Sequence, residues 1–252
     1  MKRARVAHEG ATQWVEVPDD GASVRLRTGE RIAAGNVQWL APHSRDATIF
    51  ALGLNYADHR KELGFKSQDP PLIFLKGPNS LVGHLGETVR PADANQMHPE
   101  CELVAIIGKP AHRVRADAAL DYVGGYTIAC DYAIREYLEN YYRPNLPVKN
   151  RDATTPLGPW TVDAADIPDP QALKLRTIVN GHVVQEGSTS DMIMTVADLI
   201  VYLTQTMTLM PGDMILTGTP QGVHYCAAGD EVVCEIEKIG RLVNHLVGEA
   251  AR

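Results

Sequence analysis

The sequence predicts an α+β protein that is mostly β, with a small β-rich unit at its N-terminus. Three observations indicate this class. Many short apolar segments lie between glycine and proline turns, helical periodicity is clear in few places, and 252 residues suffice to bury a large core. We expect a small N-terminal unit over residues 1–46 and one large domain over residues 47–252.

The first 46 residues alternate short apolar pieces with charged turns. In the segment 14–21, the alternating run Trp-Val-Glu-Val is followed by the turn-forming residues Pro-Asp-Asp-Gly. Alternation of this kind is typical of a half-buried strand. From residue 48 onward the pattern changes to apolar runs between turns, which places the boundary between the two predicted units.

Seven apolar segments of the large domain are predicted to be strands. Glycine, proline and aspartate turns bound them, as at Pro-Gly-Asp 211–213 and Ala-Gly-Asp 228–230. The predicted strands are 49–54, 72–75, 103–107, 126–130, 175–179, 214–217 and 231–236.

Helices are predicted in three places. Apolar residues recur at i, i+3, i+4 and i+7 over 196–205, and Thr195 with Asp198 resembles a capping box at its start. The amphipathic stretch 133–142 predicts a second helix, which ends before Pro144 because the residue preceding a proline disfavours helical geometry. A short helical turn is expected over 55–62.

The composition argues against several classes of partner. The chain has 24 basic and 31 acidic residues, a net charge of −7, and no basic stripe that would indicate nucleic-acid binding. It has no apolar run of about 20 residues that could cross a membrane, and residues 1–5 do not resemble a signal peptide. The four cysteines show no paired spacing and are expected to be buried thiols. We therefore expect a cytoplasmic protein that binds neither nucleic acid nor membranes.

Two glutamates one residue apart are the most informative feature of the chain. Glu100 and Glu102 begin an apolar strand, and side chains two apart on a strand point to the same face. Adjacent carboxylates repel and are disfavoured near a buried strand unless a cation offsets their charge. The alternative is a solvated strand end without a metal, which is common for this pattern.

Asp131 strengthens the metal hypothesis. It ends a second apolar run and precedes the predicted helix 133–142, and such junctions often carry functional side chains. Three carboxylates without a thiolate or imidazole cluster are typical ligands of Mg²⁺ or Mn²⁺ rather than zinc. His98 precedes a proline and is interpreted as a loop residue rather than a fourth ligand.

His59 and Glu62 are candidates for proton transfer. The predicted helical turn places them at i and i+3, where the carboxylate could orient the imidazole. Charged neighbours surround the pair, so the local sequence alone favours an ordinary surface pair. The following segment, 64–71, is polar and proline-rich and could act as a lid.

Three further residues could bind a carboxylate or an oxyanion. Lys149 lies in a cation-rich segment where a solvated loop lysine is the default interpretation, whereas Lys76 ends an apolar strand. Thr219 belongs to the turn 217–223, whose hydroxyls and backbone N–H groups could hold a carboxylate. The chain contains neither glycine-rich nucleotide motif, so this turn is not a phosphate loop.

Several ordered motifs together resemble the fumarylacetoacetate hydrolase family over about residues 48–247. They are Gly-Leu-Asn-Tyr-x-x-His-x-x-Glu at 53–62, the Glu-x-Glu strand, Gly-Tyr-Thr at 125–127 through Asp131, Gly-Pro-Trp at 158–160, Val-Asn-Gly at 179–181, and Pro-Gly-Asp at 211–213 through Thr-Gly-Thr-Pro at 217–220. The resemblance implies a mixed β-sandwich roll and a homodimer.

The resemblance also implies roles for site residues. Glu100, Glu102 and Asp131 match the family's ligands of Mg²⁺ or Mn²⁺. His59 and Glu62 match its lid dyad, and Lys149 matches its active-site lysine. Substrate carboxylates or an oxyanion are then expected to contact Lys76, Arg135 and Thr219.

Within the family, the run 131–146 resembles members that decarboxylate and isomerise 2-oxo or 2-hydroxydienoic di- and tricarboxylates in homoprotocatechuate and 4-hydroxyphenylacetate catabolism. The expected reaction passes through a dienolate held by the metal. The alternatives are an acylpyruvate hydrolase, an oxaloacetate decarboxylase, or a non-catalytic module with a structural cation. Leu138 stands where some hydrolases of the family carry a glutamine, which argues against hydrolysis, and the bifunctional relative has two fused copies of the domain where this chain has one.

Overall fold

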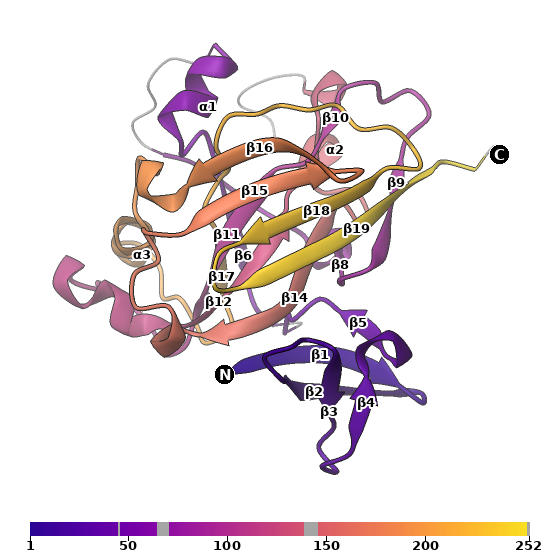
Figure 1. Cartoon of the computed structure of the whole chain (residues 1–252). Helices are drawn as coiled ribbons and strands as arrows, with labels where there is room; N and C mark the ends of the chain where they lie inside the picture. The colour runs from indigo at the N-terminus through magenta and orange to yellow at the C-terminus, as the bar shows by residue number, and fades with distance from the viewer. Residues whose placement is uncertain (45, 65–70, 139–145, 251–252) are drawn as a thin grey trace.

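Two β-sheets packed face to face form the body of the protein (Figure 1). The structure is a computed structural model that describes residues 1–44, 46–64, 71–138 and 146–250. The main core lies between the sheets and takes side chains from both, for example Leu103, Ile128, Leu175 and Leu242. The predicted α+β, mostly β sandwich is confirmed.

The larger sheet has twelve strands and carries the acidic residues of the site. Its strands are β1 (Lys2–His8), β2 (Ala11–Val17), β3 (Ser23–Arg25), β4 (Arg31–Ala33), β5 (Gln38–Leu40), β6 (Ile49–Gly53), β7 (Leu72–Leu75), β8 (Leu81–Val82), β11 (Cys101–Ile107), β12 (Val123–Cys130), β14 (Thr155–Asp163) and β17 (Met214–Leu216). The order is β4-β3-β2-β1-β14-β12-β11-β17-β6-β7, with β5 paired to β1 and β8 to β14.

A five-stranded sheet covers one face of the larger sheet. Its order is β16-β15-β18-β19-β9, and its strands are β9 (Gly86–Arg90), β15 (Lys174–Val179), β16 (His182–Ser188), β18 (Glu231–Ile236) and β19 (Gly240–Gly248). A separate pair joins β10 (Met97–His98) to β13 (Ala133–Ile134). All seven predicted strands are present, whereas β8, β9, β10, β13, β14, β16 and β19 of the large domain were not predicted.

The helices are short. The α-helices are α1 (Ala57–Glu62), α2 (Leu146–Lys149) and α3 (Val196–Thr204), and the 3₁₀ helices are η1 (Ala34–Asn36), η2 (Pro78–Ser80), η3 (Ala116–Tyr122), η4 (Arg135–Tyr137), η5 (Ala164–Asp166) and η6 (Thr189–Asp191). The capping box of α3 is confirmed, because Thr195 and Asp198 exchange side-chain to backbone hydrogen bonds. Within the described ranges, every helix is too short or too polar to cross a membrane.

The predicted helix 133–142 is wrong for the part that the structure describes. Residues 133–134 form β13, residues 135–137 form η4, and residues 139–142 lie outside the described ranges. Pairing with β10 and the hydrogen bond from the Arg135 N–H to the Gln96 carbonyl (3.2 Å) override the amphipathic pattern. Asp131 therefore ends a strand without leading into a helix.

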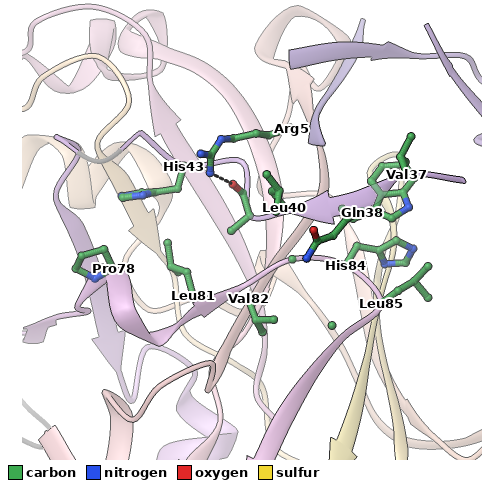
Figure 2. Close-up of a pocket in the computed structure, with 14 residues that line it drawn as sticks. Arg5, Val37, Gln38, Leu40, His43, Pro78, Leu81, Val82, His84 and Leu85 are labelled. Atoms are coloured by element: carbon green, nitrogen blue, oxygen red, sulfur yellow. Dashed lines mark hydrogen bonds between the residues drawn. The ribbon is translucent and has the colours of Figure 1, made fainter. Parts of the chain in front are cut away.

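The N-terminal strands have a core of their own around Val6, Val15 and Trp39. They are also continuous with the larger sheet, because β1 pairs with β2 on one side and with β14 on the other. The division of the chain at residue 46 remains a prediction. A pocket of about 550 Å³ lies where these strands meet the segment 78–86 (Figure 2), and none of the predicted site residues lines it.

The four cysteines are buried thiols, as predicted, and none of them is in a disulfide. Cys101 and Cys130 face each other as partners in the β11–β12 ladder. Each is adjacent in sequence to an acidic residue of the predicted metal site. Because successive side chains of a strand point to opposite faces, the thiols and the carboxylates point in opposite directions.

Candidate functional site

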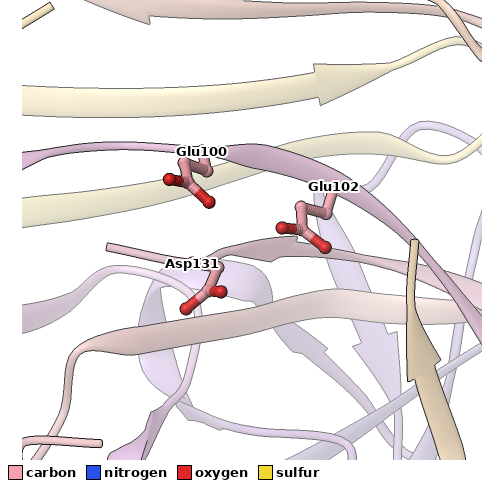
Figure 3. A group of neighbouring side chains, drawn as sticks. All are labelled: Glu100, Glu102 and Asp131. Atoms are coloured by element: carbon pink, nitrogen blue, oxygen red, sulfur yellow. The ribbon is translucent and has the colours of Figure 1, made fainter. Parts of the chain in front are cut away.

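Three carboxylates gather where β11 begins and β12 ends. Glu100, Glu102 and Asp131 each offer an oxygen atom, and these atoms lie within 4.8 Å of one another (Figure 3). Antiparallel pairing of β11 with β12 aligns the two strand ends, and the Asp131 N–H donates to the Glu100 carbonyl (2.9 Å). The structure thus brings together the trio that the Glu-x-Glu pattern and Asp131 predicted.

The triad is buried in the protein. The exposed fraction is 6% for Glu100 and 0% for both Glu102 and Asp131, so these are not solvated carboxylates at a strand end. Burial of three carboxylates is costly unless positive charge or hydrogen-bond donors accompany them. Two buried lysines supply part of that charge.

Lys149 ties two of the carboxylates together. Its ammonium group donates to Glu100 Oε2 (2.7 Å), Asp131 Oδ2 (3.0 Å) and the Asp131 carbonyl (3.0 Å), which uses all three of its N–H bonds. The default interpretation of Lys149 as a solvated loop lysine is wrong, because it ends α2 and is 6% exposed. Lys76 donates to Asp131 Oδ1 (2.5 Å) and to the Lys149 carbonyl.

The two glutamates have opposite pKa shifts. Burial opposes ionisation of Glu100, but the charge of Lys149 and its other neighbours outweighs this and lowers its pKa. Burial raises the pKa of Glu102, and repulsion from Asp131 and Glu100 raises it further. The Gly218 N–H, which donates to Glu102 Oε2 (2.7 Å), offsets only part of that. Positive charge is therefore lacking on the Glu102 side of the triad.

The pKa values of the two buried lysines are also shifted by this environment. Burial lowers the pKa of Lys76 despite its contact with Asp131. Burial also opposes the charge of Lys149, but attraction to Asp131 and Glu100 outweighs it and raises the pKa of this lysine. Lys149 is thus held as a cation between two carboxylates.

A divalent cation fits the arrangement. Glu102 Oε1 is buried and has no hydrogen-bond partner among the described residues. An unpartnered buried carboxylate oxygen, aimed at a site lined by two more carboxylates, is suited to coordination by Mg²⁺ or Mn²⁺. Such an ion would supply the missing positive charge.

His59 and Glu62 form a hydrogen-bonded pair on α1, with His59 Nδ1 3.1 Å from Glu62 Oε2. The side chain of His59 is 4% exposed and that of Glu62 is 30% exposed, so the pair is not the ordinary surface pair that the local sequence favours. Burial alone would raise the pKa of Glu62, but the N–H groups of Val223 and Gly222, together with His59, lower it. The predicted lid 64–71 falls mostly outside the described residues.

Arg135 contacts the triad directly and also contacts His98, a residue that the sequence interpretation left out of the site. Arg135 Nη2 donates to Glu100 Oε1 (3.1 Å), and Arg135 Nε donates to His98 Nε2 (2.8 Å). His98 is not a loop residue but part of β10, and it is 1% exposed. Its burial lowers its pKa to about 3, so the ring is neutral and accepts the hydrogen bond. The sequence feature that could have identified His98 as a site residue is its position two residues before Glu100.

The turn 217–223 holds carboxylates, but they are the protein's own. Gly218 donates to Glu102, while the N–H groups of Gly222 and Val223 donate to the Glu62 carboxylate at 3.1–3.2 Å. These N–H groups are therefore occupied by the protein's own carboxylates, and the prediction that the turn could hold a further carboxylate stays a prediction. Thr219, in the middle of the turn, is 2% exposed.

The family follows from sequence comparison. Residues 48–247 match the model of the fumarylacetoacetate (FAA) hydrolase C-terminal family, so the chain belongs to this family. The 4-hydroxyphenylacetate degradation bifunctional isomerase/decarboxylase of Salmonella dublin is 54% identical over 216 residues, which make up 86% of this chain and 50% of that protein. The chain thus spans about half the length of the curated relatives it matches.

Solved structures share the complete fold. The 5-carboxymethyl-2-hydroxymuconate delta-isomerase of Mycobacterium smegmatis is 35% identical, with a TM-score of 0.87 and 100% of both chains covered. A maleylpyruvate hydrolase from Sphingobium sp. SYK-6, solved with manganese(II) and pyruvate, is 26% identical, with a TM-score of 0.84 and 99% of this chain and 100% of that chain covered.

Proposed function

We propose that the protein is a divalent-metal-dependent decarboxylase and isomerase of 2-oxo or 2-hydroxydienoic di- and tricarboxylates formed in 4-hydroxyphenylacetate and homoprotocatechuate catabolism. The observation that carries this proposal is the buried carboxylate triad with an unpartnered Glu102 oxygen, next to two lysines and one arginine. The 54% identity to a bifunctional isomerase/decarboxylase supports the substrate class.

The triad would hold Mg²⁺, or Mn²⁺, through Glu100, Glu102 and Asp131. When bound, the ion would act as a Lewis acid that polarises the 2-oxo group of the substrate. Lys149 keeps Glu100 and Asp131 in register, since its hydrogen bonds join both carboxylates. Manganese(II) and pyruvate in the maleylpyruvate hydrolase structure support both the ion and the 2-oxo acid.

The reaction can be divided between the chain's residues. In decarboxylation, the electron pair of the breaking C–C bond moves through the conjugated alkene onto the 2-oxo oxygen, and CO₂ leaves. His59 then delivers a proton to carbon, while Glu62, which lies at its Nδ1, orients the ring. Isomerisation of the 2-hydroxydiene needs the same proton carrier, because the 2-hydroxyl oxygen loses a proton and a carbon of the conjugated system gains one.

Other polar groups are proposed to bind the substrate. Arg135 is partly exposed, and its donors not used by His98 and Glu100 can pair with a substrate carboxylate. Lys76 has one N–H bond that no described residue accepts, and Thr219 offers a hydroxyl. A substrate with several carboxylates suits this number of donors.

We also propose that the protein is cytoplasmic and works as a homodimer. The matched region of this chain makes up half of the bifunctional relative, so the matched regions of two chains together would correspond to one such relative. Sedimentation of the purified protein measures this directly, and a monomer that retains full turnover would contradict the proposed dimer.

An ultraviolet assay tests the proposed activity. Interconversion of 2-hydroxyhepta-2,4-diene-1,7-dioate and its 2-oxo isomer is followed with EDTA-treated protein, with and without added Mg²⁺ or Mn²⁺. Metal-dependent turnover of this dioate and of 5-oxopent-3-ene-1,2,5-tricarboxylate is the expected result. Turnover that persists in EDTA would contradict the proposed metal dependence.

A hydrolase is the second candidate. The shared fold with a maleylpyruvate hydrolase favours it, and an oxaloacetate decarboxylase would use the same ion. Against hydrolysis, Leu138 stands where a water-orienting glutamine is expected, and its apolar side chain is 39% exposed. Activity on an acylpyruvate or on oxaloacetate, with none on the dienoate, would replace the first proposal with this one.

A further inference from the structure

We propose that Gln185 is a positioning residue that makes Thr219 a hydrogen-bond donor to the oxo-acid substrate. The inference rests on the proposed function, because it assumes a 2-oxo acid at the carboxylate triad. Gln185 lies on β16 in the smaller sheet and belongs to none of the groups already described for the site.

Three hydrogen bonds hold the Gln185 side chain. The Thr177 hydroxyl donates to Gln185 Oε1 (2.7 Å), and Gln185 Nε2 donates to the Pro220 carbonyl (2.8 Å) and to Thr219 Oγ1 (3.0 Å). Thr177, Gln185 and Thr219 are 0%, 4% and 2% exposed. The amide is therefore fully satisfied by buried partners.

The chemistry of these partners fixes the direction of each bond. A carbonyl oxygen only accepts, so the amide atom beside Pro220 must be the nitrogen of Gln185. Its two hydrogens are then used by Pro220 and Thr219, and Thr219 Oγ1 must act as an acceptor here. The hydroxyl hydrogen of Thr219 has to point elsewhere, and no acceptor for it is found among the described residues.

The neighbours of Thr219 in the chain lie at the site. Thr219 directly follows Gly218, whose N–H contacts Glu102, and it precedes the N–H groups of Gly222 and Val223 that hold Glu62. Thr219 thus sits in the chain segment that joins the metal triad to the proton-transfer pair. An anionic oxygen of the substrate is the acceptor this hydroxyl lacks.

Gln185 also supports the turn by close packing. Gly222 has a φ of +122°, and a Cβ atom there would lie 2.9 Å from the Cβ of Gln185. The turn can approach Gln185 this closely only with glycine at position 222. In addition, Thr177, Gln185 and Thr219 donate in one consistent direction, which polarises the last hydroxyl and strengthens it as a donor.

The variant Gln185→Glu tests the inference with almost no change in volume. The atom facing Thr219 becomes a carboxyl oxygen, which accepts the hydroxyl hydrogen and withdraws it from the substrate. Gln171→Glu is the matched control. Gln171 Nε2 likewise donates to a backbone carbonyl, that of Thr189 (2.8 Å), and its Oε1 accepts from the Val196 N–H (3.0 Å), outside the turn.

The measurement is calorimetric binding of pyruvate to the full chain saturated with Mn²⁺, together with KM and kcat for the dienoate. We expect Gln185→Glu to raise the Kd for pyruvate by roughly tenfold or more, as for loss of a hydrogen bond to a charged oxygen. Thr219→Val should do the same, and Thr219→Ser should retain wild-type binding. KM should rise more than kcat falls, because the hydroxyl binds the substrate and does not transfer a proton.

A double variant separates positioning from general damage. If Gln185 acts through Thr219, Gln185→Glu adds nothing to the Kd of Thr219→Val. Equal weakening by Gln185→Glu and Gln171→Glu, or a full additional effect in the Thr219→Val background, would overturn the inference. Should Gln185→Glu fail to fold, Thr177→Val takes its place, with a smaller rise in Kd that must also vanish in the Thr219→Val background.

The two proposals can fail separately. Wild-type protein that binds pyruvate with Mn²⁺ but does not turn over the dienoate or the tricarboxylate would end the proposed function, and the Kd comparison would still decide the role of Gln185. Wild-type protein that does not bind pyruvate would overturn the inference as well, since Thr219 would then have no oxo acid to contact.

Discussion

The two halves of the site are built in contrasting ways. The carboxylate half lies at the ends of two central, mutually paired strands, and its three acidic residues are at most 6% exposed. The half proposed for proton transfer lies on α1, a helix of six residues, and the side chain of Glu62 is 30% exposed. Strand pairing positions the first half, whereas hydrogen bonds from the turn 217–223 position much of the second.

This difference fits the two proposed chemical tasks, metal coordination and proton transfer. Coordination needs three oxygen atoms fixed close together, and a sheet interior supplies that rigidity. Proton transfer needs a group that the substrate can reach, and short elements with few buried contacts open at lower free-energy cost than central strands. We therefore expect substitutions in the carboxylate half to change metal binding and those on α1 to change turnover or local stability.

The largest effect is expected from Glu102→Gln, which should reduce turnover to background even with excess Mn²⁺. Glu102 has the unpartnered oxygen, so the variant lacks the ligand that completes the site. Its free energy of unfolding should not fall, because the substitution removes a buried carboxylate that its neighbours repel. Turnover and urea unfolding measure the two effects, with exposed Glu87→Gln as the control. Full metal-dependent activity in Glu102→Gln would show that the carboxylate half does not hold the ion.

His59→Ala should lower kcat by roughly 10²- to 10⁴-fold, the usual contribution of a positioned proton carrier. Mn²⁺ affinity should be unchanged, because His59 is not one of the clustered carboxylates. Stopped-flow turnover and Mn²⁺ titration make the comparison, and exposed His182→Ala serves as the control. If His59→Ala lost as much Mn²⁺ affinity as turnover, the two halves of the site would not have separate roles in metal binding and proton transfer.

Lys149→Met should destabilise the metal-free protein by about 3 kcal/mol or more, because it leaves buried carboxylates without their cation. Added Mn²⁺ should then raise the melting temperature of this variant more than that of the wild type, since the ion replaces the lost charge. Thermal unfolding with and without Mn²⁺ tests this. The exposed Lys174→Met should be within about 0.5 kcal/mol of wild type. An identical response to Mn²⁺ in Lys149→Met and wild type would contradict the shared role.

The smallest expected effect is that of Glu62→Gln on stability, about 1 kcal/mol at pH 7. The folded protein lowers the pKa of Glu62 below its ordinary value of 4.5, so its carboxylate stabilises the fold above that pH. This contribution is lost as the pH falls through the lower, folded-state pKa. Urea unfolding at pH 7 and at successively more acidic values should show the difference between variant and wild type shrinking. If the stability difference between variant and wild type did not depend on pH, the contacts between Glu62 and the turn would not depend on the charge of its carboxylate.

The carboxylate half could be predicted from the sequence because it depends on local rules. The two-residue period of a strand places Glu100 and Glu102 on one face, and the end of the next apolar run places Asp131 beside them. The burial of Lys149 could not be predicted, since its partners lie 18 and 49 residues away along the chain. Its cation-rich neighbourhood indicated solvent instead.

The missed elements have a common physical cause. β14 contains two prolines and a glycine, which normally mark turns, yet pairing with both β1 and β12 keeps it extended. The segment 133–138 has an amphipathic pattern, but contacts with β10 and with His98 decide its conformation. The local sequence does not indicate the proposed positioning role of Gln185, because this role depends on Thr177 and on a turn 35 residues later.

The alternation of β11 separates hard from soft donor atoms within one strand. Glu100 and Glu102 present oxygen on one face, and Cys101 presents sulfur on the other, with Cys130 as its ladder partner. A cation held by the carboxylates therefore meets no thiolate from these strands, which disfavours thiophilic ions such as Cd²⁺ and Cu⁺. A register slip of a single residue would exchange the two sets. The hydrogen bonds that align β11 and β12 would thus also specify which class of metal the proposed site selects.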